Sequence, residues 1–127
     1  MQKTPVISIV DDDEAVRLAL RSLVRSLGYV SNVFASAEEF LESSQLNETS
    51  CLISDIQMPG MNGIELQNRL RILDHSTPVI FVTAFPDERN RARALEAGAI
   101  GFLEKPFEGC AMIKLIETAL RAHGEQA

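Results

Sequence analysis

The sequence predicts an α/β protein in which five parallel strands form one doubly wound sheet with helices on both faces. Its 127 residues, 46% hydrophobic and 24% charged, suit a single domain with one buried core. Five short apolar runs alternate along the chain with five stretches of helical periodicity. Such a (βα)₅ alternation folds through right-handed crossovers into an open parallel sheet.

The strands are expected at residues 6–10, 29–34, 51–54, 79–83 and 100–103. The first, third and fourth runs consist almost only of apolar or small residues, as strands covered on both faces do. We therefore predict that these three strands lie in the centre of the sheet.

The first two helices carry clear boundary signals. Apolar residues recur at spacings of three and four through residues 15–27, and Gly28 follows as the expected C′ residue. Ser36 precedes a short apolar stretch, and Glu39 lies three residues later, which is the spacing of a capping box. These patterns predict one helix before Gly28 and a short one after Ser36.

The last three helices differ in how much apolar surface they offer. Residues 64–73 and 111–122 show apolar side chains at helical spacing, with Leu73 counted on the apolar face. Residues 87–97 offer little more than alanines and Leu95, interrupted by three arginines. We expect this fourth helix to be held to the sheet weakly.

Composition also limits the location and the partners. We expect one domain over residues 1–127, with a core from about 5 to 122 and a tail or linker at 123–127. Cys51 and Cys110 form no C-x-x-C pair and lie among apolar residues, which predicts reduced thiols.

No apolar run reaches the ~18–20 residues of a membrane span, and no signal peptide is visible. A cytoplasmic protein follows, and the net charge of −6 disfavours direct binding to nucleic acid.

Polar residues gather where the predicted strands end. They are Asp11, Asp12 and Asp13 after the first strand, Asp55 after the third, Thr83 at the end of the fourth and Lys105 after the fifth. The carboxyl ends of parallel strands meet at one edge, so these side chains should lie together. Neighbouring carboxylates repel unless a cation intervenes, and hard oxygens favour Mg²⁺. The alternative is a solvated loop, and Asp13 or Glu14 is expected to cap the first helix.

The same residues suit phosphoryl chemistry. A carboxylate such as Asp55 can accept a phosphoryl group when a metal and a positive side chain offset the charge. Lys105 is placed for that role, and Pro106 restricts its geometry and permits a cis bond. Thr83 offers a hydroxyl donor. Each residue alone also has a structural explanation: Asp55 as a strand-end Asp, Lys105 as an exposed lysine and Thr83 as a β-branched strand residue.

Four segments occur in order along the chain: Ile9-Val10-Asp11-Asp12-Asp13, Asp55 with Met58-Pro59-Gly60-Met61-Asn62-Gly63, Val82-Thr83-Ala84, and Glu104-Lys105-Pro106-Phe107. From about Val6 to about Ala122 the chain resembles the receiver domain of two-component response regulators. The Glu-Lys-Pro-Phe ending and Phe102 look most like receivers of the FixJ type. The resemblance implies a flavodoxin-like, or CheY-like, sheet with strand order 2-1-3-4-5.

The resemblance implies a metal-dependent phosphoacceptor. Asp55 matches the residue that takes a phosphoryl group from a sensor histidine kinase or phosphotransfer protein. Asp12 and Asp55 would bind Mg²⁺, with Mn²⁺ as a substitute, while Asp11 would act mostly through a water and Gln57 through its backbone carbonyl. Thr83 and Lys105 would contact the phosphoryl oxygens. The implied domain is no enzyme beyond accepting its own phosphoryl group and losing it slowly.

The resemblance also implies a conformational switch. Thr83 would move toward the phosphate and Phe102 would turn inward behind it, held by packing because it lacks a hydroxyl. The weakly held fourth helix supplies a physical reason for motion between Thr83 and Phe102. A phosphorylation-dependent homodimer through the fourth helix and fifth strand is expected. The sequence leaves open whether a helix-turn-helix DNA-binding domain follows.

One departure from the family pattern besides the missing hydroxyl of Phe102, and three alternative functions, complete the prediction. Phe85 replaces a polar residue two positions after Thr83, so slow loss of the phosphate is expected. A haloacid-dehalogenase-type phosphohydrolase would use Asp11 and Asp13 as D-x-D, but Ala15 stands where it needs threonine or valine. A flavin site lacks its phosphate loop. A module that only docks partners would not need the full set of site residues.

Overall fold

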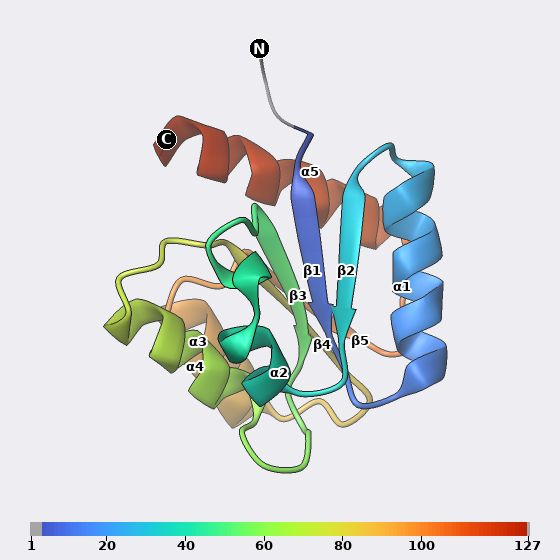
Figure 1. Ribbon diagram of the computed structural model, residues 1–127. Helices are drawn as coiled ribbons and strands as arrows, with labels where there is room; N and C mark the ends of the chain where they lie inside the picture. The colour runs from blue at the N-terminus through green and yellow to red at the C-terminus, as the bar shows by residue number, and fades with distance from the viewer. Residues whose placement is uncertain (1–3, 127) are drawn as a thin grey trace.

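The computed structural model describes residues 4–126 and contains one five-stranded parallel sheet (Figure 1). The strands are β1 (Val6–Val10), β2 (Val30–Phe34), β3 (Cys51–Asp55), β4 (Val79–Thr83) and β5 (Gly101–Glu104). Their order is β2-β1-β3-β4-β5, and all neighbours pair in parallel. This confirms the predicted fold and the central position of β1, β3 and β4.

Six helical segments connect and follow the strands: α1 (Glu14–Ser26), α2 (Ala37–Glu42), the short 3₁₀ helix η1 (Ser44–Leu46), α3 (Gly63–Ile72), α4 (Glu88–Glu96) and α5 (Gly109–Gln126). They divide between the two faces of the sheet, as Figure 1 shows. Residues of α1 and α5 pack on one face, and residues of α2, α3 and α4 pack on the other. No described helix is both long and apolar enough to cross a membrane.

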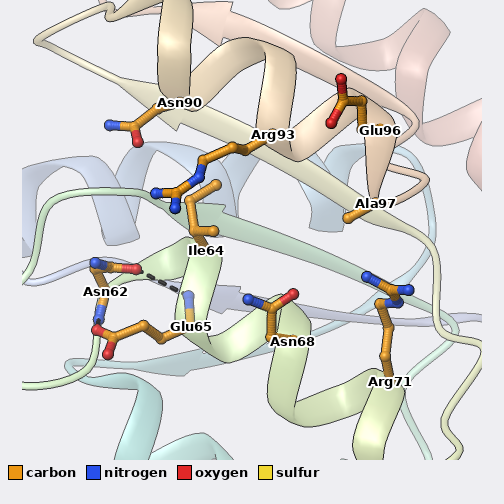
Figure 2. Close-up of a pocket in the computed structure, with 9 residues that line it drawn as sticks. All are labelled: Asn62, Ile64, Glu65, Asn68, Arg71, Asn90, Arg93, Glu96 and Ala97. Atoms are coloured by element: carbon orange, nitrogen blue, oxygen red, sulfur yellow. Dashed lines mark hydrogen bonds between the residues drawn. The ribbon is translucent and has the colours of Figure 1, made fainter.

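Local signals explain most helix boundaries. Gly28 follows Leu27, the C-cap of α1, and has a φ of 88°, in the left-handed region that favours glycine. Ser36 accepts a hydrogen bond from the Glu39 N–H at 3.1 Å and so begins α2 as predicted. A capping box with both of its hydrogen bonds, which the sequence reading missed, joins Asn62 and Glu65 at the start of α3 (Figure 2).

Three expectations need correction. Helix α5 continues to Gln126, whereas a tail was expected from residue 123, because the helical hydrogen bonds extend past the last apolar position. Leu73 is the C-cap of α3 and is 48% exposed, so it does not belong to the buried face. Cys110 is exposed. Cys51 is buried, which raises the pKa of its thiol to about 12, and both cysteines are free.

Helix α4 is weakly held, as its composition predicted. Ala94 is its only buried residue, and Leu95 is 42% exposed. The α1–α5 face contrasts with this, because it buries Leu20, Val24 and Met112 almost completely. One face of the sheet therefore includes a helix with little buried apolar surface.

The buried face of α3 yields a stability prediction. Leu70 is 2% exposed, whereas Ile72 on the same helix is 79% exposed. Leu70→Ala should lower the free energy of unfolding by about 3 kcal/mol, because it removes buried methyl groups and leaves a cavity. Ile72→Ala should change it by less than about 0.5 kcal/mol. Urea denaturation of both variants tests the assignment, and equal losses would contradict it.

Candidate functional site

The carboxyl edge of the sheet brings the predicted site residues together. Asp11 directly follows β1, Asp55 is the last residue of β3, and Thr83 is the last residue of β4. Lys105 directly follows β5. Because β1, β3, β4 and β5 are consecutive neighbours in the sheet, these four residues meet at one edge.

Three carboxylates form an acidic cluster. One oxygen of each of Asp11, Asp12 and Asp55 lies within 4.8 Å of the others. Asp11 is fully buried and Asp55 is 6% exposed, while Asp12 is exposed. Carboxylate oxygens at this spacing fit a hard divalent cation such as Mg²⁺, and the exposed Asp12 leaves room for the waters that Mg²⁺ retains.

Lys105 is the cation that faces this cluster. Its Nζ lies 2.8 Å from Asp11 Oδ2 and 3.3 Å from Asp55 Oδ2. Burial lowers the pKa of the Lys105 ammonium, but the hydrogen bond and the charge of Asp11, together with Asp55, outweigh burial and raise this pKa. The Lys105–Pro106 peptide bond is cis, the isomer that the sequence permitted.

Asp55 carries an incompletely balanced charge. Burial raises the pKa of its carboxyl, and the negative charge of Asp11 raises it further. Lys105 and the backbone N–H of Ile56, which donates to Asp55 Oδ1 at 2.7 Å, act in the opposite direction. The net pKa lies above the usual value, so an additional cation at this position is electrostatically favourable.

Thr83 and the loop after it lie beside the cluster. Thr83 is buried, and its Oγ1 accepts a hydrogen bond from the Phe85 N–H at 3.1 Å. The Phe85 side chain is 66% exposed. The Thr83 hydroxyl hydrogen is not used in this bond and remains available to an acceptor.

Two further predicted residues, Phe102 and Gln57, do not belong to the acidic cluster. Phe102 is partly buried on β5, where it packs against the core beneath α2, α3 and α4. Gln57 is exposed and lies two residues beyond Asp55. The metal-binding role of its carbonyl stays a prediction.

The loop between β1 and α1 contains one expected and one missed contact. Asp13 caps α1 by accepting from the Ala15 N–H at 2.9 Å, as predicted. Arg17 was missed: its Nη1 donates to the backbone carbonyl of Asp11 at 2.8 Å and so fixes the loop that carries the acids. The sequence did offer a signal for this contact, namely a basic residue one turn into the helix that follows an acidic loop.

Several grooves lie on the described surface. An apolar groove of about 660 Å³ adjoins the cluster and is lined by Asp13 and Lys105 together with apolar residues of α1 and the segment after β5. A polar groove of about 450 Å³ lies between α3 and α4 (Figure 2). Only the apolar groove shares residues with the site.

Comparison with known proteins agrees with this geometry. Residues 7–117 match the family described as the response regulator receiver domain. The chain is 39% identical over 124 residues to the response regulator protein TodT of Pseudomonas putida, covering 98% of this chain and 55% of TodT. It is 36% identical over 115 residues to the transcriptional regulatory protein FixJ of Bradyrhizobium diazoefficiens, covering 91% of this chain and 56% of FixJ. The chain thus spans slightly more than half the length of these relatives.

Solved structures show the same likeness. The response regulator StyR superposes with a TM-score of 0.91 at 43% identity, covering 98% of this chain and 63% of StyR. The structure of FixJ-N superposes with a TM-score of 0.83 at 36% identity, covering 95% and 96% of the two chains. With the strand order and the acidic edge already established, the chain belongs to the response regulator receiver domain family of two-component signalling.

Proposed function

We propose that Asp55 accepts a phosphoryl group from a phosphohistidine of a sensor histidine kinase or phosphotransfer protein, with Mg²⁺ bound by the acidic cluster. The observation that supports this most strongly is the placement of Asp55 among Asp11, Asp12 and Lys105. A carboxylate in that setting combines a nucleophilic oxygen, a metal site and a fixed positive charge.

The transfer forms one bond and breaks another. An oxygen of Asp55 attacks the phosphorus, and the P–N bond of the donor breaks with its electron pair remaining on the imidazole, which takes up a proton. The product is an acyl phosphate. Lys105 offsets charge on the transferring oxygens, and Thr83 donates its hydroxyl to one of them. Bound Mg²⁺ would supply further neutralisation of the phosphoryl charge.

The apolar groove supports binding of the phosphodonor protein beside Asp55. Its lining includes Val16, Leu20 and Phe107, and it continues into the site through Asp13 and Lys105. Apolar surface of this kind next to a reactive carboxylate favours a protein partner. A protein docked there brings its phosphohistidine to the acidic cluster.

The response to phosphorylation is proposed to pass through Thr83, Phe102 and α4. The phosphoryl group adds charge and acceptor oxygens that draw the Thr83 hydroxyl, and Phe102 fills the space behind it. Helix α4 then shifts because Ala94 alone anchors it in the core. The surface of α4 and β5 would mediate a phosphorylation-dependent homodimer.

The relatives support a role in transcriptional control. FixJ is named a transcriptional regulatory protein, and the chain matches little more than half of it. We infer that this domain regulates an attached output domain, of a helix-turn-helix type that binds DNA, in the cytoplasm. The receiver itself would not contact nucleic acid, because its net charge is −6.

Phosphorylation can be tested by mass. Incubation with acetyl phosphate and Mg²⁺ should add one phosphoryl group to the wild-type chain and none to Asp55→Asn, because Asp55 is the proposed acceptor and the buried Asp11 is paired with Lys105 at 2.8 Å. Lys105→Ala should lower the labelling rate at least about 10²-fold through loss of the charge that stabilises the transfer. Equal labelling of Asp55→Asn would refute the assignment, and a label on Asp11 would favour the phosphohydrolase.

The charge balance predicts an unusual stability effect. In metal-free buffer at neutral pH, Asp55→Asn should raise the free energy of unfolding by about 1 kcal/mol, because it relieves carboxylate repulsion while Lys105 keeps Asp11 as its partner. Since the pKa of Asp55 is raised in the folded state, this gain is full above that pKa and disappears as the pH falls below the ordinary value for aspartate.

Asp12→Asn is the matched control for this effect. Asp12 is exposed, so its replacement should change the stability of the metal-free protein by less than about 0.5 kcal/mol. Added Mg²⁺ should stabilise the wild type and should stabilise both variants less. Urea denaturation of the wild type and both variants across pH, with and without Mg²⁺, measures these changes in the free energy of unfolding. A destabilised Asp55→Asn in metal-free buffer would contradict the charge balance.

The loop after Thr83 predicts a long-lived phosphate. Phe85 offers no polar group to orient an attacking water, so the phosphorylated domain should have a half-life above about one minute at neutral pH with Mg²⁺. Phe85→Asn should shorten this half-life while leaving the urea midpoint unchanged, because Phe85 is largely exposed. The measurement is the decay of the labelled mass over time. An unchanged half-life in Phe85→Asn would show that Phe85 does not determine the lifetime of the phosphate.

A further inference from the structure

The loop that joins β3 to α3 is fixed at both of its ends. This loop, residues 56–62, begins directly after Asp55 and contains Gln57. The Gly63 N–H donates to the Ile56 carbonyl at 2.8 Å and closes the base of the loop. The Met58 side chain is 8% exposed and anchors the middle in the core. The position of the loop therefore determines what surrounds the Asp55 carboxylate.

A side chain from another helix holds the far part of this loop. Glu38, on α2, accepts a hydrogen bond at its Oε2 from the Met61 N–H at 3.0 Å. Gly60 makes this approach possible, because a Cβ atom there would lie 2.6 Å from the same carboxylate oxygen. Gly60 also has a φ of 78°, which favours glycine.

Glu38 is distinctive among the contacts of the loop. Within the part of the chain that the structure describes, every other side-chain hydrogen bond to residues 56–62 comes from Asp55 or from Glu65 of α3. The Met61 N–H lowers the pKa of the Glu38 carboxyl, so the acceptor is ionised at neutral pH. Glu38 is exposed, so water competes with this hydrogen bond, and the negative charge of the acceptor favours it.

We propose that Glu38 is a positioning residue for phosphoryl transfer: through Met61 it holds the 56–62 loop in the arrangement that Asp55 and the Gln57 carbonyl need. This inference rests on the proposed function, because it assigns a role to a residue outside the acidic cluster. Glu38 contacts neither the metal ligands nor the phosphoryl group. Its effect passes through the backbone of the loop.

Three variants separate this role from a general effect on α2. Glu38→Ala removes the acceptor, whereas Glu38→Gln keeps a neutral oxygen that can accept from Met61. Glu39→Ala is the matched control, because Glu39 is an exposed glutamate on the same turn of α2 whose side chain does not contact the loop in the hydrogen bonds described. Urea denaturation of the three variants establishes that each is folded under the conditions of the assays.

Two readouts test the proposal on the folded proteins. Amide hydrogen exchange at Met61 is measured without metal, and the Mg²⁺ dissociation constant is measured by calorimetry. Glu38→Ala should speed exchange at Met61 and raise the Mg²⁺ dissociation constant about fivefold, somewhat less than loss of a direct outer-shell partner. Its labelling by acetyl phosphate at subsaturating Mg²⁺ should slow accordingly. Glu38→Gln should lie between the wild type and Glu38→Ala, because its neutral oxygen accepts a weaker hydrogen bond, and Glu39→Ala should equal the wild type.

The outcomes distinguish this role from the proposed function. If the wild type is labelled and Glu38→Ala matches it in Mg²⁺ affinity and labelling rate, the positioning role is wrong. Equal losses in Glu39→Ala would also overturn it, because they would reflect the charge of α2 in general. If the wild type itself takes no label, the proposed function falls and the positioning role falls with it.

Discussion

The central constraint on this domain is the meeting of three carboxylates with one lysine at the edge of its sheet. Strands β1 and β3 are buried on both faces, so their ends bring Asp11 and Asp55 out of water together. Lys105 and a few N–H donors compensate only part of the charge, and the pKa of Asp55 is raised as a result. The incompletely compensated charge is the feature on which the proposed binding of a divalent cation and the proposed acceptor role of Asp55 both rest.

The two faces of the sheet divide rigidity and mobility between them. Helices α1 and α5 bury a continuous apolar cluster that includes Ile7, Ile53 and Ile116, and this cluster keeps the carboxylate-bearing strands in register. On the other face, α4 contributes Ala94 alone. The acidic cluster therefore lies on well-packed strands, and the proposed conformational response passes through α4 because this helix buries only one residue.

The sequence predicted those features that depend on short-range pattern. Apolar runs identified β1, β3 and β4 as central, and strand-end positions brought Asp11, Asp55, Thr83 and Lys105 together before any coordinates. The strand order came from the resemblance, because alternation alone leaves several orders open. Two contacts were missed: Arg17 donates to the carbonyl of Asp11 six residues before it, and Glu38 accepts from the N–H of Met61 23 residues after it. The first had a local signal, whereas the second depends on how α2 is docked, which no local pattern encodes. The end of α5 was misplaced for a different reason, since helical hydrogen bonds continue where apolar periodicity stops.

A connection between the acceptor and α4 follows from the pairing of β4 with β5. The Lys105 N–H donates to the Thr83 carbonyl at 2.7 Å, so the two residues proposed to contact the phosphoryl group are also linked through their backbones. Two residues before Thr83, Phe81 pairs in register with Phe102, and both contact the core beneath α4. A pull on the Thr83 side chain therefore acts at the junction of two strands whose neighbouring aromatic residues pack under the least anchored helix. Phe102 has no hydroxyl to fix an inward state, so in the proposed response its position is set by packing and follows the space that Thr83 leaves. The proposed equilibrium between two states should therefore be sensitive to small changes in volume at Thr83, Phe81 and Ala94, and comparatively insensitive to polar substitutions on the exposed surface of α4.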